Sequence, residues 1–298
     1  MPAKRRGPIP HYACPMTSLP VGTDELIDRA LEEDLGTGDV TAEATVPADR
    51  LAQAHIVQKE PGVICGLDIV EEVFRRTGAT EMDRTVIEGH WHDSVPRDVA
   101  LIQGPARSLL AGERVALNFL GHLSGISTVT ALYVEAVAGT GAKILDTRKT
   151  TPGMRLLEKR AVSWGGGMNH RFGLYDAVLI KENHIAMAGG VEAAVDATRR
   201  ASPDLKIEVE AETLEEVAAA LRAEADQILL DNMEPGTLRA AVSARDESRP
   251  ATRLEASGGI TLENVAAVAA TGVDFISIGA LTHSAPSLDL SLLLEVSD

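Results

Sequence analysis

The chain has 298 residues, of which 45% are apolar, and this is enough to bury the core of one large domain or two smaller ones. Its 44 acidic and 28 basic residues give a formal net charge of -16, which excludes binding to nucleic acid or to an anionic membrane through overall charge. No apolar run reaches the roughly 18 residues of a transmembrane helix. Cys14 and Cys65 form neither a disulfide framework nor a metal-ligand pattern, so a soluble, cytoplasmic protein is expected.

The N-terminal part of the chain predicts a tail followed by an α+β domain. Residues 1–22 are basic and rich in proline, which is typical of a disordered tail rather than a signal peptide. Over residues 23–116, "AQAHIVQKEPGVICG" predicts a strand, a turn and a strand, and "LDIVEEVFRRTG" predicts a helix that ends at Gly78. A helix near residues 108–123 joins this domain to the next. The segment 285–298 contains "LDLSLLLEVSD", which predicts a strand that returns to the first domain.

Residues 117–284 predict a repeating βα pattern. Short apolar runs alternate with amphipathic helical stretches, so a parallel sheet with right-handed crossovers is expected. Polar residues follow nearly every run, which favours a closed barrel over an open sheet, where they would gather at one switch point. The region is short for eight units, so we expect a reduced barrel. The predicted strands are "AKILD", "DAVLI", "LKIEVE", "DQILL", "TRLEAS" and "VDFISIG".

The residues that end these strands predict a site for anions and a metal. Several cations together suit a small polyanion, because Arg binds carboxylate and phosphate through paired hydrogen bonds and Lys adds a mobile charge. Two carboxylates on adjacent strands suit Mg²⁺, and glycine-rich turns before helices suit phosphate. The cations are Arg148, Lys149, His170, Arg171 and Lys181; the carboxylates are Glu210 and Asp231; the glycine-rich rim contains Ser257, Gly258, Gly259 and Gly279.

The order of these motifs resembles the quinolinate phosphoribosyltransferase family, also called carboxylating nicotinate-nucleotide pyrophosphorylase. The motifs are "TRKTTPG", "GGGMNHR", "LIKENHI", "EVEAETLEE", "ILLDNM", "LEASGGI" and "GALTHS", and the likeness covers nearly all of residues 23–290. The resemblance implies an α/β sandwich domain followed by an incomplete, about seven-stranded α/β barrel. It also implies Mg²⁺-assisted conversion of quinolinate and phosphoribosyl pyrophosphate to nicotinate mononucleotide, diphosphate and CO₂, a step of NAD biosynthesis.

The resemblance also implies residue roles. Arg148, His170, Arg171 and Lys181 would hold the two carboxylates of quinolinate, and Arg114 in "GERVALN" would reach it from the other subunit of a homodimer, which could assemble further. Lys149 would contact the reacting centre or the diphosphate. Glu210 and Asp231 would bind the ribose hydroxyls and Mg²⁺. The 5-phosphate would be held by Ser257, Gly258, Gly259 and Gly279.

Two positions depart from the family pattern, and several polar residues have plainer interpretations. Arg160 stands where Tyr is common, and Ser163 stands where a basic residue is common. Glu208 shares a strand face with Glu210, and its part in the site is left open. The glycines of "GGG" either end a helix or free the loop that carries His170, and "EEDLGTGD" is expected to be a capped turn. Structural roles are expected for His55, His90, His92 and His122.

Two alternatives to the decarboxylating transferase stay open. One is a relative of the same fold that uses another acidic base, such as nicotinate, or a molybdenum-associated relative. The other is a non-catalytic phosphate-binding or nucleotide-binding protein. More than one cation facing the base favours a dicarboxylate, and the carboxylate pair beside the phosphate site favours catalysis over binding alone.

Overall fold

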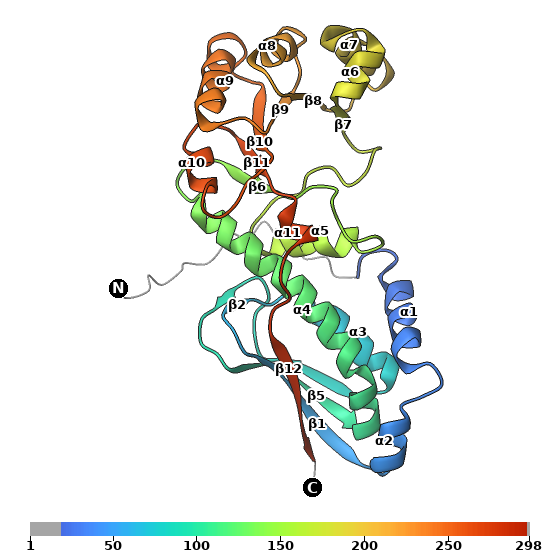
Figure 1. Ribbon diagram of the computed structural model, residues 1–298. Coiled ribbons are helices and arrows are strands. Elements are labelled where there is room, and N and C mark those ends of the chain that lie inside the picture. The colour runs from blue at the N-terminus through green and yellow to red at the C-terminus, as the bar shows by residue number, and fades with distance from the viewer. Residues whose placement is uncertain (1–18, 297–298) are drawn as a thin grey trace. The chain divides into compact units, whose positions relative to one another are not determined.

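The computed structural model describes residues 19–296, and two compact units are distinguished within them (Figure 1). Unit 1 contains the described residues up to Ala131, together with Thr151–Gly166 and the residues from Ser284 onward. Unit 2 contains Leu132–Thr150 and Gly167–His283. Most of the predicted disordered tail, residues 1–18, lies outside the described residues.

Unit 1 is built on an antiparallel sheet with the strand order β12-β1-β5-β3. Alternate residues of β1 are buried, including Ala54 and Ile56, because one face of this sheet packs on the core. The C-terminal strand β12 pairs along β1 from Ala52 opposite Val296 to Gln58 opposite Leu290. The strands of unit 1 are β1 (Leu51–Gln58), β2 (Gly62–Val63), β3 (Glu81–Arg84), β4 (Trp91–His92), β5 (Arg97–Pro105) and β12 (Leu290–Val296).

The helices of unit 1 end where the sequence provides a stop. Gly78 has a φ of 104°, a left-handed conformation that suits glycine, and it ends α3. In "EEDLGTGD", the Asp39 carboxylate accepts hydrogen bonds from the backbone N–H groups of Thr41 and Ala42, so the capped-turn interpretation is confirmed. The helices are α1 (Thr23–Leu35), α2 (Val40–Thr45), α3 (Leu67–Thr77) and α5 (Arg155–Trp164), with α4 (Ala106–Ala136) running on into unit 2.

Helix α4 is longer than the sequence predicts, because its apolar pattern continues well beyond residue 123. It is the one helix among the described residues that is long and apolar enough to cross a membrane by length and composition. However, 72% of its most apolar window is buried inside the protein, as in the core helix of a folded domain. Gly112 of α4 leaves no room for a side chain, because an added Cβ would lie 2.9 Å from the Phe74 ring of α3.

Unit 2 contains a six-stranded parallel sheet with the order β6-β11-β10-β9-β8-β7 (Figure 1). At the β6 edge, Leu145 also forms a single parallel bridge to Met168. The prediction of an incomplete α/β barrel is therefore confirmed, with six strands in the continuous sheet. They are β6 (Lys143–Leu145), β7 (Val178–Ile180), β8 (Ile207–Ala211), β9 (Gln227–Asp231), β10 (Arg253–Ser257) and β11 (Phe275–Ser277).

Between β7 and β11, successive strands are connected by helices of unit 2, as in a parallel βα repeat. Their amphipathic faces bury small apolar side chains, such as Val195 of α7 and Val217 of α8, which are both fully buried. All six predicted strands of the repeat are present, each within about two residues of its predicted start. The helices are α6 (Glu182–Ala188), α7 (Val191–Ala201), α8 (Leu214–Arg222), α9 (Pro235–Ser248), α10 (Val265–Ala269) and α11 (Ala280–His283).

Candidate active site

The carboxyl ends of the unit 2 strands carry the predicted site residues. Because all six strands are parallel, their carboxyl ends lie at one edge of the sheet. Arg148 and Lys149 follow β6, Lys181 follows β7, and the others end β8, β9, β10 and β11 or lie just beyond them. His170 and Arg171 are tied to the same edge, since the backbone N–H of His170 donates to Asp146 directly after β6. Arg114 lies on α4 in unit 1 and is exposed.

The cationic part of the site places two guanidinium groups near each other. Burial lowers the pKa of Arg171, and the positive charge of Arg148 lowers it further. The Arg171 Nη1 donates a long hydrogen bond of 3.3 Å to the carbonyl of Ala177. Two cations that repel each other in a partly buried position form a site for an anion, because a ligand with negative charge relieves both the burial and the repulsion.

Lys181 and Glu210 connect the cationic and acidic parts of the site. The Lys181 Nζ donates to Oε2 of Glu210 across the neighbouring strands β7 and β8. The Glu210 side chain is only 15% exposed, whereas that of Lys181 is 49% exposed. A substitution at either residue therefore removes the ion-pair partner of the other.

Asp231 lies at the end of β9 beside a tight turn. Its Oδ2 accepts a hydrogen bond of 2.9 Å from the side-chain amide of Asn232, which has a φ of 53°. Gly258, after β10, has a φ of 93°, and an added Cβ would lie 2.1 Å from the Asn232 Oδ1. Only glycine fits at position 258, because its φ is positive and Asn232 occupies the space that a Cβ would need.

Lys149 lies against the turn that follows β11. A Cβ added to Gly279 would lie 3.0 Å from the Lys149 Cδ. The Thr282 hydroxyl donates 2.8 Å to the Lys149 carbonyl, so α11 holds the backbone of the loop that carries this lysine. The predicted phosphate-binding glycine and the predicted catalytic lysine are thus neighbours.

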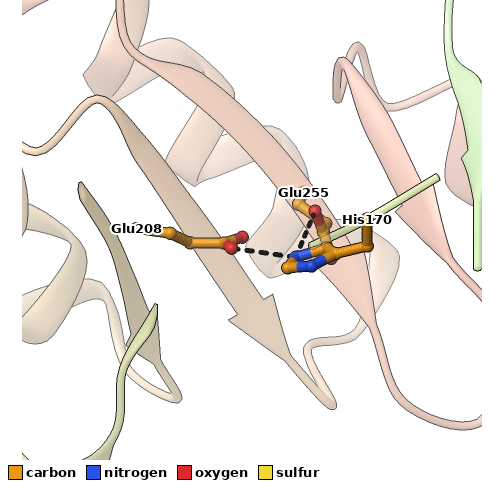
Figure 2. A group of neighbouring side chains, drawn as sticks. All are labelled: His170, Glu208 and Glu255. Carbon is orange, nitrogen blue, oxygen red and sulfur yellow. Dashed lines mark hydrogen bonds and ion pairs between the residues drawn. The ribbon is translucent and has the colours of Figure 1, made fainter. Parts of the chain in front are cut away.

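His170 bonds to carboxylates inside the unit 2 sheet (Figure 2). Its Nε2 lies 2.9 Å from Oε2 of Glu208 and 3.7 Å from Oε2 of Glu255. Its Nδ1 accepts a hydrogen bond of 2.8 Å from the backbone N–H of Arg171. That His170 binds a substrate carboxylate stays a prediction, and in the structure both ring nitrogens have protein partners.

Three residues beneath the predicted site were missed or left open by sequence reasoning: Glu208, Gln227 and Glu255. The Gln227 Nε2 donates to Glu208 Oε1 at 2.8 Å and to Glu255 Oε2 at 2.7 Å. Burial, and then the charge of Glu208, raises the pKa of Glu255 to about 8. The signal that identifies them is the alternation of strand residues, since Glu208 and Glu255 precede Glu210 and Ser257 by two positions on the same strand face.

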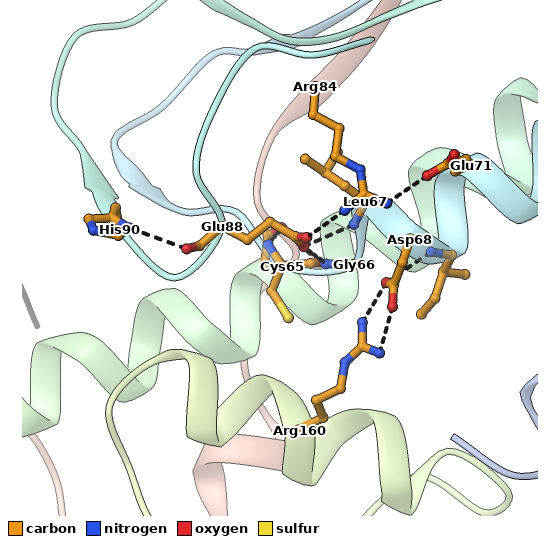
Figure 3. A network of polar contacts seen from close by, with 11 residues as sticks. Cys65, Gly66, Leu67, Asp68, Glu71, Arg84, Glu88, His90 and Arg160 are labelled. Carbon is orange, nitrogen blue, oxygen red and sulfur yellow. Dashed lines mark hydrogen bonds and ion pairs between the residues drawn. The ribbon is translucent and has the colours of Figure 1, made fainter. Parts of the chain in front are cut away.

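The departure from the family pattern at Arg160 has a structural explanation in unit 1 (Figure 3). The guanidinium of Arg160 forms a paired ion bridge with the Asp68 carboxylate of α3, with nitrogen–oxygen distances of 2.8 and 2.5 Å. Beside this pair, Glu88 accepts hydrogen bonds from the backbone N–H groups of Gly66 and Leu67 at the start of α3. The Arg160 charge is therefore used within unit 1 to link α5 to α3.

The loop and thiol near Arg160 also have structural roles. Gly165 follows α5, and an added Cβ would lie 2.4 Å from the Ser127 carbonyl oxygen of α4, so the first glycine of "GGG" ends a helix in close contact. Burial, and then the charge of Glu88, raises the pKa of the Cys65 thiol to about 12. A protonated, buried thiol is a poor nucleophile and a poor metal ligand.

Four other histidines bond to protein groups in unit 1. His55 Nδ1 lies 3.2 Å from Asp98, and His122 Nε2 lies 2.8 Å from Glu158. His90 and His92 contact the carbonyls of Glu88 and Ile87. Among the described residues, the one group of ligand atoms close enough to hold a metal ion is that of His170, Glu208 and Glu255.

The fold and the strand-end site define a class of α/β-barrel enzymes that bind anionic substrates. The model of the C-terminal domain of quinolinate phosphoribosyl transferase matches residues 126–293, and the model of the N-terminal domain matches residues 39–124. Together these matches cover most of the chain. The chain belongs to the quinolinate phosphoribosyltransferase family, whose members are pentosyl-transferring enzymes.

Named relatives and solved structures support this assignment. The chain is 47% identical to nicotinate-nucleotide pyrophosphorylase (carboxylating) of Mycobacterium leprae, over 90% of this chain and 95% of that protein. It is 41% identical to the human protein of the same name, over 92% of each chain. The structure resembles the nicotinate-nucleotide pyrophosphorylase of Francisella tularensis with a TM-score of 0.87 and 38% identity, over 92% of this chain and 96% of that one.

Proposed function

We propose that this protein transfers the phosphoribosyl group of phosphoribosyl pyrophosphate to quinolinate, with decarboxylation, to give nicotinate mononucleotide, diphosphate and CO₂. Family membership supports the reaction class, and the residues at the strand ends support the choice of substrate. The reaction is a step of NAD biosynthesis. A cytoplasmic location is part of the proposal.

The observation that carries the proposal is that Arg148 and the segment carrying Arg171 lie at the same end of the unit 2 sheet, since the His170 backbone N–H donates to Asp146 directly after β6. Quinolinate has two carboxylates on adjacent ring carbons, so a pocket for it needs more than one cation at close range. Burial, and then the positive charge of Arg148, lowers the pKa of Arg171, as expected for two cations at the same end of the sheet. Lys181 follows β7 and provides a third charge at the same end of the sheet. A monocarboxylate such as nicotinate would present only one anionic group to these cations.

The other half of the site suits phosphoribosyl pyrophosphate. The backbone at Ser257, Gly258 and Gly259 offers N–H donors for the 5-phosphate, and Asn232 fixes this turn. Gly279 allows the Lys149 stem to lie directly against the turn after β11. Lys149 is thereby held where it can stabilise negative charge on the diphosphate as it leaves.

Mg²⁺ is part of the proposal, and the acidic residues fit it. Glu210 and Asp231 offer hard carboxylate oxygens from adjacent strands, which is the ligand type that Mg²⁺ prefers. When bound, the ion would neutralise charge on the diphosphate of the substrate. In the structure, Glu210 forms an ion pair with Lys181. A metal ion would therefore compete with the Lys181 ammonium group for this carboxylate.

The chemistry then depends on the placement of charge. The ring nitrogen of quinolinate attacks the anomeric carbon of the ribose while the bond to diphosphate breaks, and the ribose passes through an oxocarbenium-like state. Carboxylates near the ribose stabilise that positive character, and Lys149 stabilises the departing anion. The product nitrogen is cationic, so the adjacent carbon can accept the electron pair released when CO₂ leaves. A proton then replaces the carboxylate.

The proposal includes a homodimer in which Arg114 completes the site of the neighbouring subunit. Many residues of α4 are buried, but Arg114 is exposed. Its charge is therefore available to a second chain. An arginine from the partner would add one further cation for the carboxylates of quinolinate.

The direct test is product formation by the purified protein. With quinolinate, phosphoribosyl pyrophosphate labelled in the ribose, and Mg²⁺, labelled nicotinate mononucleotide and stoichiometric CO₂ are expected. A transferase that uses nicotinate would form the same product without releasing CO₂. Nicotinate is therefore the comparison substrate. Turnover with nicotinate but not with quinolinate would refute the proposed function and favour the relative that uses a monocarboxylate base.

A further inference from the structure

We propose that Glu208, Gln227 and Glu255 are positioning residues that hold His170 as a neutral ring, so that His170 in turn fixes the backbone that presents Arg171 to the substrate. The inference deepens the proposed function, because it assumes that Arg171 binds quinolinate. None of the three residues lies among the groups expected to touch a substrate.

The hydrogen bonds of His170 determine which ring nitrogen carries the proton. Nδ1 accepts the backbone N–H of Arg171, and an acceptor nitrogen has no proton of its own. The proton of a neutral ring must then lie on Nε2, which donates it to Glu208. A doubly protonated imidazolium would place two donors, Nδ1–H and the Arg171 N–H, against each other. The geometry thus selects a neutral His170 with its proton on Nε2.

Gln227 holds the two carboxylates on which this choice depends. One amide nitrogen donates to both Glu208 and Glu255, and it comes from β9, the strand between β8 and β10. Both carboxylates are almost completely buried, at 6% and 0% exposed. Groups that are buried this deeply and bonded to each other have few alternative positions, so Oε2 of Glu208 is fixed in front of His170.

The position of the His170 ring affects Arg171 because the two residues are adjacent in the chain. His170 is held at three points: its N–H by Asp146, its Nε2 by Glu208, and its Nδ1 by Arg171. The Nδ1 bond fixes the peptide that enters Arg171, whose guanidinium donates a long hydrogen bond to the Ala177 carbonyl. Orientation of a cation within a fraction of an ångström matters for paired binding of a carboxylate.

The same three side chains are also spaced as metal ligands, with ligand atoms within 4.8 Å of one another. A metal at this place would bind Nε2 of His170. In the tautomer described above, Nε2 carries a proton and has no lone pair to offer a metal. A metal ion would also compete with the Gln227 amide for Oε2 of Glu255, the oxygen that lies 3.7 Å from His170. The hydrogen-bond network accounts for all of these contacts without an ion.

The tautomer can be measured without any reference to activity. Long-range proton–nitrogen NMR spectra of the ¹⁵N-labelled full-length protein, with the His170 signals identified by their absence in His170→Gln, give the state of each ring nitrogen. We expect a pyridine-type Nδ1 and a pyrrole-type Nε2 at neutral pH. A proton on Nδ1, an imidazolium, or a metal ion coordinated by the His170 ring would overturn the proposal.

Steady-state kinetics then test the link to Arg171. Gln at position 208 has only one acceptor oxygen, so Glu208→Gln must lose the bond to His170 or to Gln227. We expect its KM for quinolinate to rise about tenfold, corresponding to about 1.4 kcal/mol, while the KM for phosphoribosyl pyrophosphate changes less than about twofold. The exposed Glu215→Gln on α8 loses the same charge and should behave as wild type.

A double-mutant cycle separates positioning from general damage. If Glu208 acts through Arg171, Glu208→Gln should add little to the quinolinate KM once Arg171 is already Ala, because the group that it positions is gone. Full additivity of the two effects would overturn the proposal even if Glu208→Gln is well folded. If that variant does not fold, the wild-type NMR spectrum still decides the tautomer. If the spectrum shows the expected tautomer but the protein does not use quinolinate, the proposed function is refuted and the assignment of the tautomer still holds.

Discussion

Arg160 and Asp68 form a two-fold charged contact between α5 and α3, with the guanidinium nitrogens 2.8 and 2.5 Å from the carboxylate oxygens. The side chains are 12% and 27% exposed, so the pair is largely shielded from water. A basic residue at a position where the family pattern has Tyr is thus used for packing between two helices of unit 1. We therefore do not expect Arg160 to act as a further cation for the substrate.

Removal of Arg160 is therefore expected to lower stability and not substrate affinity. Arg160→Ala leaves Asp68 with a partly buried, unpaired charge, and we expect a loss of about 2 kcal/mol in the free energy of unfolding, measured by urea denaturation. Asp68→Asn in the same background should recover part of that loss, because the unpaired charge is removed. An increase of more than about threefold in the KM for quinolinate would contradict this assignment.

Loss of a cation at the strand ends should weaken binding of the dicarboxylate selectively. We expect Arg148→Ala and Arg171→Ala to cost roughly 2–5 kcal/mol in quinolinate binding and much less in binding of phosphoribosyl pyrophosphate, measured by calorimetry. Lys143→Ala, at the opposite end of β6, is the matched control and should bind both ligands normally. Equal losses of affinity for both ligands would contradict the assignment of these arginines to quinolinate.

Loss of a carboxylate should instead change the dependence on metal. Asp231→Asn and Glu210→Gln remove hard oxygen charge from the proposed Mg²⁺ site, so the Mg²⁺ concentration for half-maximal activity should rise at least about tenfold. The exposed Asp204→Asn, which lies before β8, is the control. Wild-type Mg²⁺ titrations for both variants would show that the acidic part has been misplaced.

Arg114 provides a test of the proposed dimer. Arg114→Ala and Lys181→Ala are each expected to be nearly inactive, yet mixing, dissociating and reassociating the two should restore activity. In a mixed dimer both lesions fall in one site, and the other site is intact. With random exchange, about half of the dimers are mixed, so about a quarter of wild-type activity should return. If native mass spectrometry detects mixed dimers and no activity returns, Arg114 does not act across the interface.

Glu255 predicts a pH dependence of stability. Its pKa is raised in the folded protein to about 8 from an ordinary value of 4.5, mainly by burial, so the folded state binds the proton more tightly than the unfolded state. This contribution is fully present below pH 4.5 and is lost as the pH rises through about 8, with a slope of up to about 1.4 kcal/mol per pH unit between these values.

The variant Glu255→Gln removes this titration while it retains an acceptor for the Gln227 amide. Its unfolding free energy relative to wild type should therefore increase between pH 5.5 and pH 8, as measured by urea denaturation at several pH values. Glu215→Gln, which is exposed, should show no such trend. A difference between Glu255→Gln and wild type that stays constant over this range would contradict the raised pKa.

The sequence by itself determined the order of elements and the identity of the strand-end residues. Apolar runs alternate with amphipathic helices, and parallel strands must place their carboxyl ends together, so Arg148, Lys181, Glu210 and Asp231 could be assigned to one edge without coordinates. Likewise, Gly78 and Asp39 specified a helix stop and a helix cap through local chemistry, because backbone conformation and capping depend on neighbours in the chain.

Only the tertiary structure decided which of these residues bond to one another. Alternation places Glu208 on the same strand face as Glu210, but whether that face meets water or the interior depends on the closure of the sheet. The pairing of Arg160 with Asp68 and of His170 with Glu208 joins residues 92 and 38 positions apart. Contacts over such separations depend on packing of whole elements, and no local pattern in the sequence specifies them.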